Sequence, residues 1–241
     1  MSLPTAQQLY SVLEGTWPAA ARKRLGPWTI RLDGSGSSRV SAATAEGPVT
    51  EADIPQAEDA MRAAGQVPLF MIREGDAAVD ALLAGRGYAI KDPVNIYASP
   101  VRDIATERPP PVTSFEVWPP LAAQVEIWAV GGIGAGRLAV MDRAPHPKTT
   151  LLGRMNDRPA GTVYVAVSAD CAMLHALEIG KQHRGQGLGR YLTRAAAFWG
   201  QARGADYLTL VTTQANTGAN ALYSSLGMTL VGHYHYRTLP E

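Results

Sequence analysis

The feature that most limits the fold of this chain is an internal repeat of about twenty residues. Residues 81–100 read ALLAGRGYAIKDPVNIYASP and residues 221–240 read ALYSSLGMTLVGHYHYRTLP, and the two align without a gap at an offset of 140 residues. In each copy a short helical pattern ends at a glycine, Gly87 or Gly227, and an extended pattern follows. A chain that carries this unit twice is expected to fold as two related halves.

A proline-rich stretch separates the two copies. TERPPPVTSF contains Pro109, Pro110 and Pro111, and proline removes backbone donors and favours extended chain. We therefore predict two domains, 1–110 and 111–241, here called the first and second halves. Strands and helices are mixed rather than strictly alternating, so the predicted fold class is mixed α/β (α+β), with a mostly antiparallel central sheet flanked by helices in each half.

Local patterns predict the elements of each half. In the first half, PWTIRLDG and SRVSAATAEG alternate like two strands joined by a Gly/Ser turn, and EADIPQAEDAMRAAG has helical spacing. In the second half we expect TSFEVW to be a strand, PPLAAQVEIWAV a helix, and TTLLGRMNDRPAGTVYVAVSA a hairpin that turns at Asn156 and Asp157. AMLHALEI and DYLTLVTT read as strands on either side of an amphipathic helix that starts near Leu188.

Composition excludes several classes of protein. The formal net charge of +1 provides no field that would attract nucleic acid or an acidic membrane, so we expect neither as a partner. The single cysteine, Cys171, allows no disulfide framework, which indicates a cytoplasmic protein. No apolar run reaches the roughly 18 residues of a membrane span, and no spacing of ligands predicts a metal site.

The segment HRGQGLGRYL, residues 183–192, lies between an expected strand and the start of an expected helix. Glycine lets the main chain approach a ligand, and a helix start offers free N–H groups and a positive dipole end. The sequence therefore predicts a site for a pyrophosphate or a similar anion, with Arg184 and Arg190 as charged donors. A dinucleotide fingerprint fails because Arg190 stands where a third glycine is needed, and a Walker A loop fails because Gln186 and Gly187 replace Lys and Ser/Thr.

Arg184, Gly187 and Gly189 form an Arg-x-x-Gly-x-Gly motif that resembles the acyl-CoA pyrophosphate loop of the GNAT superfamily of N-acetyltransferases. The downstream stretch NTGANALYSSLGM resembles the Asn-x-x-Ala-x-x-Leu-Tyr-x-x-x-Gly ending of that superfamily, and a hydrophobic strand ending at Ile179 precedes the loop. The resemblance is strong over residues 150–240, weak over residues 111–150, and reaches the first half only through the internal repeat.

This resemblance implies acetyl-CoA as the cosubstrate and direct transfer of its acetyl group to an amine. It implies that the strand before the loop binds the pantetheine arm through its backbone and that the loop binds the pyrophosphate. The implied cofactor-binding residues are Leu177 and Ile179 on the strand, Arg184, Gly185, Gly187, Leu188, Gly189 and Arg190 in the loop, and Asn216 beyond it.

An amine must be neutral to attack a thioester, which at pH 7 costs about 4.6 kcal/mol for an alkylamine with a pKa of about 10.4. Many relatives carry a glutamate on the strand that corresponds to LTLVTTQAN, but no carboxylate occurs there in this chain. LHALEIGKQHRGQGLG resembles the same stretch of arylalkylamine N-acetyltransferases, which implies that His175 helps to move the amine proton; a satisfied strand histidine is the alternative. Strand alternation predicts that His175, Leu177 and Ile179 share one face and that Glu178 points to the other, where it could polarise a water or form an ion pair.

Tyr223 stands where the superfamily places the acid that protonates the departing sulfur of coenzyme A, although a buried packing tyrosine is the alternative. The repeat aligns Tyr223 with Leu83, and the first half has no Arg-x-x-Gly-x-Gly motif. The resemblance thus implies two tandem GNAT-like halves, of which the second is catalytic and the first is degenerate and shapes or covers the acceptor site.

The resulting hypothesis is an acetyl-CoA-dependent N-acetyltransferase that acts on a primary amine of a small molecule or a peptide. A non-catalytic acyl-CoA-binding sensor is the alternative, because the loop alone could hold the cofactor without transfer. We expect either a monomer that is itself a pseudo-dimer or a homodimer.

Overall fold

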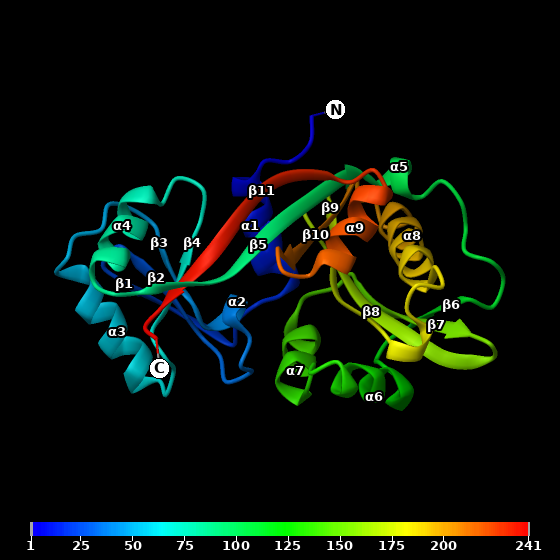
Figure 1. The fold of residues 1–241 in the computed structure, drawn as a ribbon, viewed down its shortest axis with the longest axis horizontal. Coiled ribbons are helices and arrows are strands. Elements are labelled where there is room, and N and C mark those ends of the chain that lie inside the picture. The colour runs from blue at the N-terminus through cyan, green and yellow to red at the C-terminus, as the bar shows by residue number, and fades with distance from the viewer. Residues whose placement is uncertain (1, 241) are drawn as a thin grey trace.

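A computed structural model describes residues 2–240, and in this part of the chain eleven strands form one continuous sheet (Figure 1). The strand order is β1-β2-β3-β4-β11-β5-β10-β9-β8-β7-β6. Neighbouring strands are antiparallel except for the pairs β3–β4 and β9–β10. This is the mixed α/β architecture with a mostly antiparallel sheet flanked by helices that the sequence predicts. None of the helices within residues 2–240 combines the length and apolar character of a membrane span.

The bounds of the elements are as follows. The strands are β1 (Ala21–Leu25), β2 (Trp28–Leu32), β3 (Ala43–Ala45), β4 (Leu69–Ile72), β5 (Ala89–Pro100), β6 (Ser114–Val117), β7 (Lys148–Met155), β8 (Arg158–Ser168), β9 (Cys171–Ile179), β10 (Tyr207–Thr213) and β11 (Thr229–Thr238). The helices are α1 (Ala6–Thr16), α2 (Ser38–Ser41), α3 (Asp53–Ala63), α4 (Ala77–Gly85), α5 (Val101–Ile104), α6 (Ala122–Val130), α7 (Ala135–Arg143), α8 (Leu188–Gln201) and α9 (Thr217–Ser225), with a short 3₁₀ turn η1 (Lys181–His183).

The final strands of the two halves are interchanged. β11, which ends the chain, lies between β4 and β5, and β5 lies between β11 and β10. In Figure 1 both strands run as long ribbons from one lobe of the molecule to the other. Each half therefore completes its part of the sheet with a strand from the other half.

The pairing of β5 with β11 follows the offset of the sequence repeat. Val94 pairs with Tyr234, its own equivalent, and Ala98 pairs with Thr229, the equivalent of Ala89. The β4–β11 ladder also has the same relative register as the β10–β5 ladder. The sheet thus has approximate two-fold symmetry about the centre of the β5–β11 pair.

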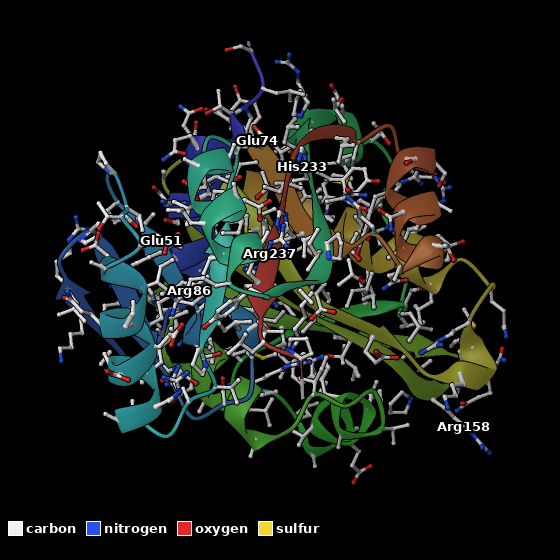
Figure 2. The ribbon with its side chains drawn as sticks, turned by 60° about the vertical axis from the view of Figure 1, so that its left-hand side comes forward. Glu51, Glu74, Arg86, Arg158, His233 and Arg237 are labelled. Carbon is white, nitrogen blue, oxygen red and sulfur yellow. The ribbon has the colours of Figure 1, made fainter. Side chains whose placement is uncertain are left out.

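Ion pairs attach β11 to the first half. Arg237 lies 2.7 Å from the Asp80 carboxylate of α4, and His235 Nε2 lies 2.8 Å from the same carboxylate. The hydrogen bond from Arg237 is the main reason that the pKa of Asp80 lies below its usual value. Nearer the middle of β11, His233 lies beside Glu74 at 3.6 Å, and Figure 2 shows this pair and Arg237 at successive positions along the strand.

Helices cover both faces of the central sheet. α8, α9 and α5 pack on one face around residues such as Leu192 and Leu208. The opposite face carries α6 and α7, which pack around Trp128, and α1, which crosses the centre through Leu9 and Leu13. α3 and α4 pack over β2, β3 and β4. Because α1 contacts strands from both halves, it ties them together on the face that α6 and α7 share.

Most of the predicted elements are confirmed. The β7–β8 hairpin turns at Asn156 and Asp157, whose φ values of 51° and 59° are those of a two-residue type I′ turn. The prediction for SRVSAATAEG is wrong in part, because Ser38–Ser41 is helical and only Ala43–Ala45 is a strand. The sequence analysis did not predict the additional elements α1, α5, α7, β1 and β4.

Candidate functional site

The glycine-rich loop forms an anion cradle at the start of α8. Gly185 and Gly187 adopt φ values of 74° and 87°, a left-handed conformation that side chains other than glycine rarely take. The first intrahelical bond runs from Tyr191 N–H to Gly187 O, so the N–H groups of Leu188 to Arg190 have no acceptor within the helix. These free donors and the positive end of the helix dipole favour a negatively charged ligand.

The two arginines of the loop are held by the protein rather than left free. Arg184 donates from Nε to Ile179 O at 3.0 Å and from Nη2 to Glu178 at 2.8 Å. Arg190 donates to Ser225 Oγ of α9 at 2.8 Å. The free donors of this loop are therefore main-chain N–H groups, and the two paired guanidiniums lie beside them.

Gly189 and Asn216 have structural roles that the motif does not reveal. A Cβ on Gly189 would lie 3.1 Å from Leu222 Cδ2, so this glycine allows α8 and α9 to pack closely. Asn216 is the N-cap of α9, and its side-chain oxygen accepts from Ala219 N–H at 3.1 Å. Gly189 and Asn216 lie at the N-terminal ends of α8 and α9. Their predicted contacts with a cofactor stay predictions.

The parallel strands β9 and β10 separate beside the loop. Their pairing runs from Cys171–Tyr207 to Leu174–Leu210, although the two strands continue to Ile179 and Thr213. Beyond Leu174 the main chain of β9 therefore has no strand partner on this side, although Ile179 O accepts from Arg184 Nε at 3.0 Å and Ala176 O accepts from Trp128 Nε1 at 2.7 Å. This opening leads towards the loop and could take an extended ligand arm.

A bulge in β9 overturns the predicted placement of His175. Tyr164 pairs with His175, but Thr162 pairs with Glu178, so β9 holds one extra residue here, and Ala176 has a φ of 53°. The alternation of β9 side chains between the two faces of the sheet therefore changes phase between His175 and Glu178.

The bulge puts His175 and Leu177 on opposite faces. Leu177 and Ile179 pack against the α8 core, whereas the ring of His175 lies among Trp17 and Tyr164 on the other face. The prediction that His175, Leu177 and Ile179 share one face is wrong.

His175 is enclosed and fully hydrogen-bonded. The residue is 2 % exposed, and its ring lies 5.0 Å from that of Trp17. Arg39 donates to Nδ1 at 3.0 Å, so Nε2 carries the proton and donates to Thr16 Oγ1 at 2.9 Å, while Thr16 donates to Val12 O. Burial, and then the charge of Arg39, hold the pKa of His175 well below 6.5.

These contacts correct the proposed role of His175 as the proton acceptor. Its one lone pair already accepts from a guanidinium, and it has almost no exposed surface. The structure supports the alternative of a satisfied strand histidine, which joins β9 to α1 and α2.

We expect His175→Gln to remove part of the acid sensitivity of the fold. The folded-state pKa of His175 is depressed, so below about pH 6.5 the unfolded chain binds a proton that the folded chain does not, and stability is lost as the pH falls. Between about pH 7.5 and 5.5 the loss amounts to about 1.4 kcal/mol, and glutamine, which can keep both hydrogen bonds, does not titrate. Urea unfolding at both pH values checks this; equal losses in wild type and variant would contradict it.

Glu178 lies between the loop and the opposite helical layer. Its side chain is 17 % exposed and pairs with Arg184. A Cβ on Gly131, at the end of α6, would clash with its carboxylate, so Glu178 also touches the α6–α7 connection. Because His175 is enclosed, Glu178 is the remaining candidate proton acceptor of β9 near the opening.

Tyr223 projects from α9 into the core beside β5 of the first half. It is 4 % exposed, and its ring lies 5.9 Å from that of Tyr97. Burial raises the pKa of Tyr223 above its usual value, so the phenol stays protonated at neutral pH. Tyr97 and Asn95 of β5 in turn hold Asn220 of α9 at 3.0 and 2.9 Å.

Comparison with known proteins agrees with this geometry. The sequence profile of the acetyltransferase (GNAT) family matches residues 101–228, which is more than half of the chain. The chain belongs to the GNAT acetyltransferase family. A search of curated protein sequences gave no significant match.

Solved structures share the fold of this GNAT acetyltransferase over nearly its full length. A GCN5-related N-acetyltransferase from Kribbella flavida superposes with a TM-score of 0.72 at 23% identity, covering 98% of this chain and 96% of that chain. A conserved protein of unknown function from Staphylococcus epidermidis gives 0.69 at 11% identity, covering 92% and 94%. A tandem GNAT protein from the clavulanic acid biosynthesis pathway gives 0.62 at 15% identity, covering 93% and 86%.

The GNAT site also contains residues of the first half that the sequence analysis did not identify. Thr16 and Arg39 bind His175, and Asn95 and Tyr97 fix α9. None of them stands in a motif, and each is more than 100 residues from its partner in the chain. The crossing of α1, the helix α2 and the interchanged strand β5 bring them there.

Proposed function

We propose that this GNAT protein is an acetyl-CoA-dependent N-acetyltransferase that acts on a primary amine of a small molecule or a peptide. The observation that carries the proposal is the cradle of free N–H groups at Gly187–Arg190, placed next to the opening between β9 and β10. Together they fit a cosubstrate that has a pyrophosphate at one end and a flexible polar arm. Acetyl-CoA, when bound, would supply an activated acetyl thioester.

Different residues of the chain bind the cosubstrate, orient it and move protons during the transfer. The loop binds phosphate, and the main chain of β9 at Leu177, together with the Ile179 N–H group, has no partner on β10 and orients the arm. Glu178, through a water, takes the proton that the amine loses when its nitrogen bonds to the acetyl carbon. Tyr223 holds a proton at its hydroxyl and donates it to the sulfur as the carbon–sulfur bond breaks.

We infer that the two halves arose from one GNAT-like unit. The support is the coincidence of the sequence repeat with the two-fold register of β5 and β11. At the position equivalent to Tyr223 the first half has Leu83, which is fully buried in an apolar cluster. The first half therefore keeps the scaffold of the unit without its proton donor, and boundaries near 1–110 and 111–241 follow from this proposal. Such a pseudo-dimer would act as a monomer or as a homodimer.

We expect Gly187→Ala to weaken the binding of coenzyme A at least tenfold. Alanine at a φ of 87° strains the loop and adds a Cβ where the main chain must approach phosphate. Gly204→Ala is the matched control, because Gly204 has a φ of 80° but lies beyond the far end of α8. Isothermal titration of coenzyme A into both variants checks the proposal; equal affinities would contradict the cradle.

A turnover assay distinguishes an acetyltransferase from a non-catalytic acyl-CoA sensor. The enclosure of His175 is the observation that favours a sensor, because it leaves fewer titratable groups near the opening. Release of free thiol from acetyl-CoA across a panel of amines is expected for the enzyme. Tight binding of acetyl-CoA with no thiol release from any amine would favour the sensor.

A further inference from the structure

A small pocket lies between α1 and the sheet of the first half, outside the candidate cofactor site. Its walls come from one side of α1 and from β2, α2 and β4, and it encloses about 20 Å³, room for one or two water-sized groups. The charged lining residues are Arg31, Arg39, Arg73 and Glu14, three cations against one anion. We call this the arginine pocket.

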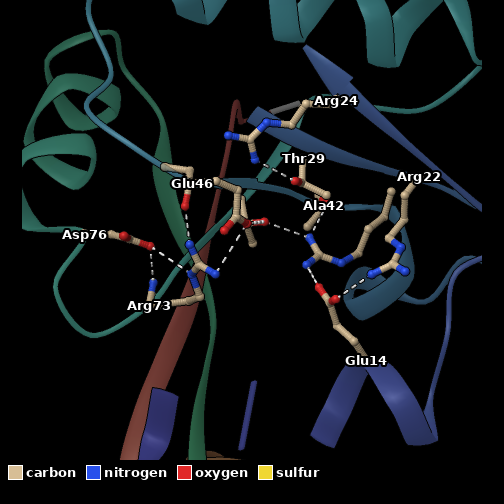
Figure 3. A network of polar contacts seen from close by, with 11 residues as sticks. Glu14, Arg22, Arg24, Thr29, Ala42, Glu46, Arg73 and Asp76 are labelled. Carbon is tan, nitrogen blue, oxygen red and sulfur yellow. Dashed lines mark hydrogen bonds and ion pairs between the residues drawn. The ribbon is translucent and has the colours of Figure 1, made fainter. Parts of the chain in front are cut away.

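Two of these guanidiniums are already compensated. Arg31 pairs with Glu14 of α1. Arg73 lies 3.4 Å from Asp76 and 3.5 Å from Glu46, and Figure 3 shows these contacts converging on it from the strand edge. Both arginines therefore build the wall of the pocket without leaving a free charge.

Arg39 is different, because it has no carboxylate partner among the ion pairs of residues 2–240. Its contacts are one hydrogen bond to His175 and the ring of Trp17, 4.6 Å from its guanidinium carbon. A guanidinium has five N–H donors, so most of its donors remain for a ligand. Burial, and then the charge of Arg39, lower the pKa of Arg137.

The hydroxyl of Tyr236, a residue that pairs with the pocket-lining Met71, is a second unsatisfied group. The residue is 2 % exposed, and its hydroxyl has no hydrogen-bond partner in the described part of the chain. Tyr236 pairs across the β4–β11 ladder with Met71, which lines the pocket, so both side chains lie on the α1 face. Burial and the neighbouring Tyr234 raise the pKa of this phenol, and the charges of Arg39 and Arg31 lower it.

We propose that the arginine pocket binds a carboxylate of the amine acceptor, with Arg39 as its counter-ion and the Tyr236 hydroxyl as a hydrogen-bond donor. A carboxylate, with its two oxygens, suits a pocket that has room for one or two water-sized groups. A planar guanidinium and a phenol are both good donors to such a group. The inference rests on the proposed function and adds a substrate class: primary amines that carry a carboxylate, such as amino acids.

The position of Arg39 connects the pocket with the reaction site. Its hydrogen-bond partner His175 directly follows Leu174, the last residue of β9 that pairs with β10. His175 thus links the pocket to the point on β9 where its ladder with β10 ends. The first half would thus select the acceptor, while the second half holds the cosubstrate.

Steady-state transfer from acetyl-CoA to matched amino acids and amino acid amides tests the proposal. The wild-type protein is expected to prefer the carboxylates at least tenfold in kcat/KM. Tyr236→Phe, which removes only an unpartnered hydroxyl, should reduce that preference at least fivefold and leave the fold and the Kd of coenzyme A unchanged. Arg39→Gln, which keeps a donor for His175 but loses the charge, should reduce it further. Tyr207→Phe is the control, because its hydroxyl binds Ser2 O away from the pocket.

Small anions provide a second readout. Acetate should compete with the amino acid for the wild-type protein and compete less well for Tyr236→Phe. Equal competition by acetate and chloride, or an unchanged preference in Tyr236→Phe, would overturn the inference. Turnover of amines without any preference for carboxylates would overturn it and leave the proposed function intact, whereas a protein that does not bind coenzyme A would overturn both.

Discussion

Expressed alone, residues 111–241 should not form a stable monomer that binds coenzyme A, although they contain the whole glycine-rich loop. β5 lies between β10 and β11, so the fragment loses the strand that both of them pair with. Ile96 and Ala98 of β5 are fully buried, and their removal exposes apolar surface on two strand edges at once. Circular dichroism melting, size-exclusion chromatography and titration with coenzyme A measure the outcome.

Co-expression of the two halves is the control for this experiment. The chain between α5 and β6 is exposed around Arg108–Pro111, so a break there removes no core contact. Residues 1–110 and 111–241 should therefore assemble into a complex that co-purifies and binds coenzyme A. A monomeric fragment 111–241 that unfolds cooperatively and binds coenzyme A as tightly as the full chain would show that β5 is not needed.

The parts of this fold that could be predicted depend on local chemistry. A glycine-rich turn between a strand and an amphipathic helix could be located from the sequence, and in the structure Gly185 and Gly187 have positive φ values. The sequence of the unpredicted helix α1 also contains a pattern typical of a helix. Thr5 and Gln8 form a capping box, and Ala6, Leu9, Tyr10 and Leu13 have the spacing of a buried helical face.

Other features could not be predicted because they depend on distant partners. A repeat predicts the same helix–strand unit twice, but it does not say whether each last strand pairs within its own half or with the other one. The bulge at Ala176 breaks the alternation rule, and nothing in the local sequence requires a positive φ there. The environment of His175 comes from Thr16 and Arg39, which are far away in the chain.

Tyr223→Phe should lower kcat by about 100-fold and leave the Kd of acetyl-CoA almost unchanged. The hydroxyl is the proposed proton donor to the departing sulfur, and loss of a general acid typically costs at least this much. Because burial raises the pKa of Tyr223, its ionisation should cause no fall in kcat between about pH 7 and 9. The measurement is the pH profile of kcat in both proteins, together with titration of acetyl-CoA.

Tyr97→Phe separates proton donation from packing. Tyr97 lies against Tyr223, and its hydroxyl donates to Asn220 of the same helix, so this variant disturbs α9 without removing the proposed donor. Its kcat should stay within a few-fold of the wild-type value, since one hydrogen bond contributes only about 1 kcal/mol to stability. If both variants slow turnover equally, Tyr223 acts by packing and the proton must come from elsewhere; if neither does, the sulfur leaves without a donor from α9.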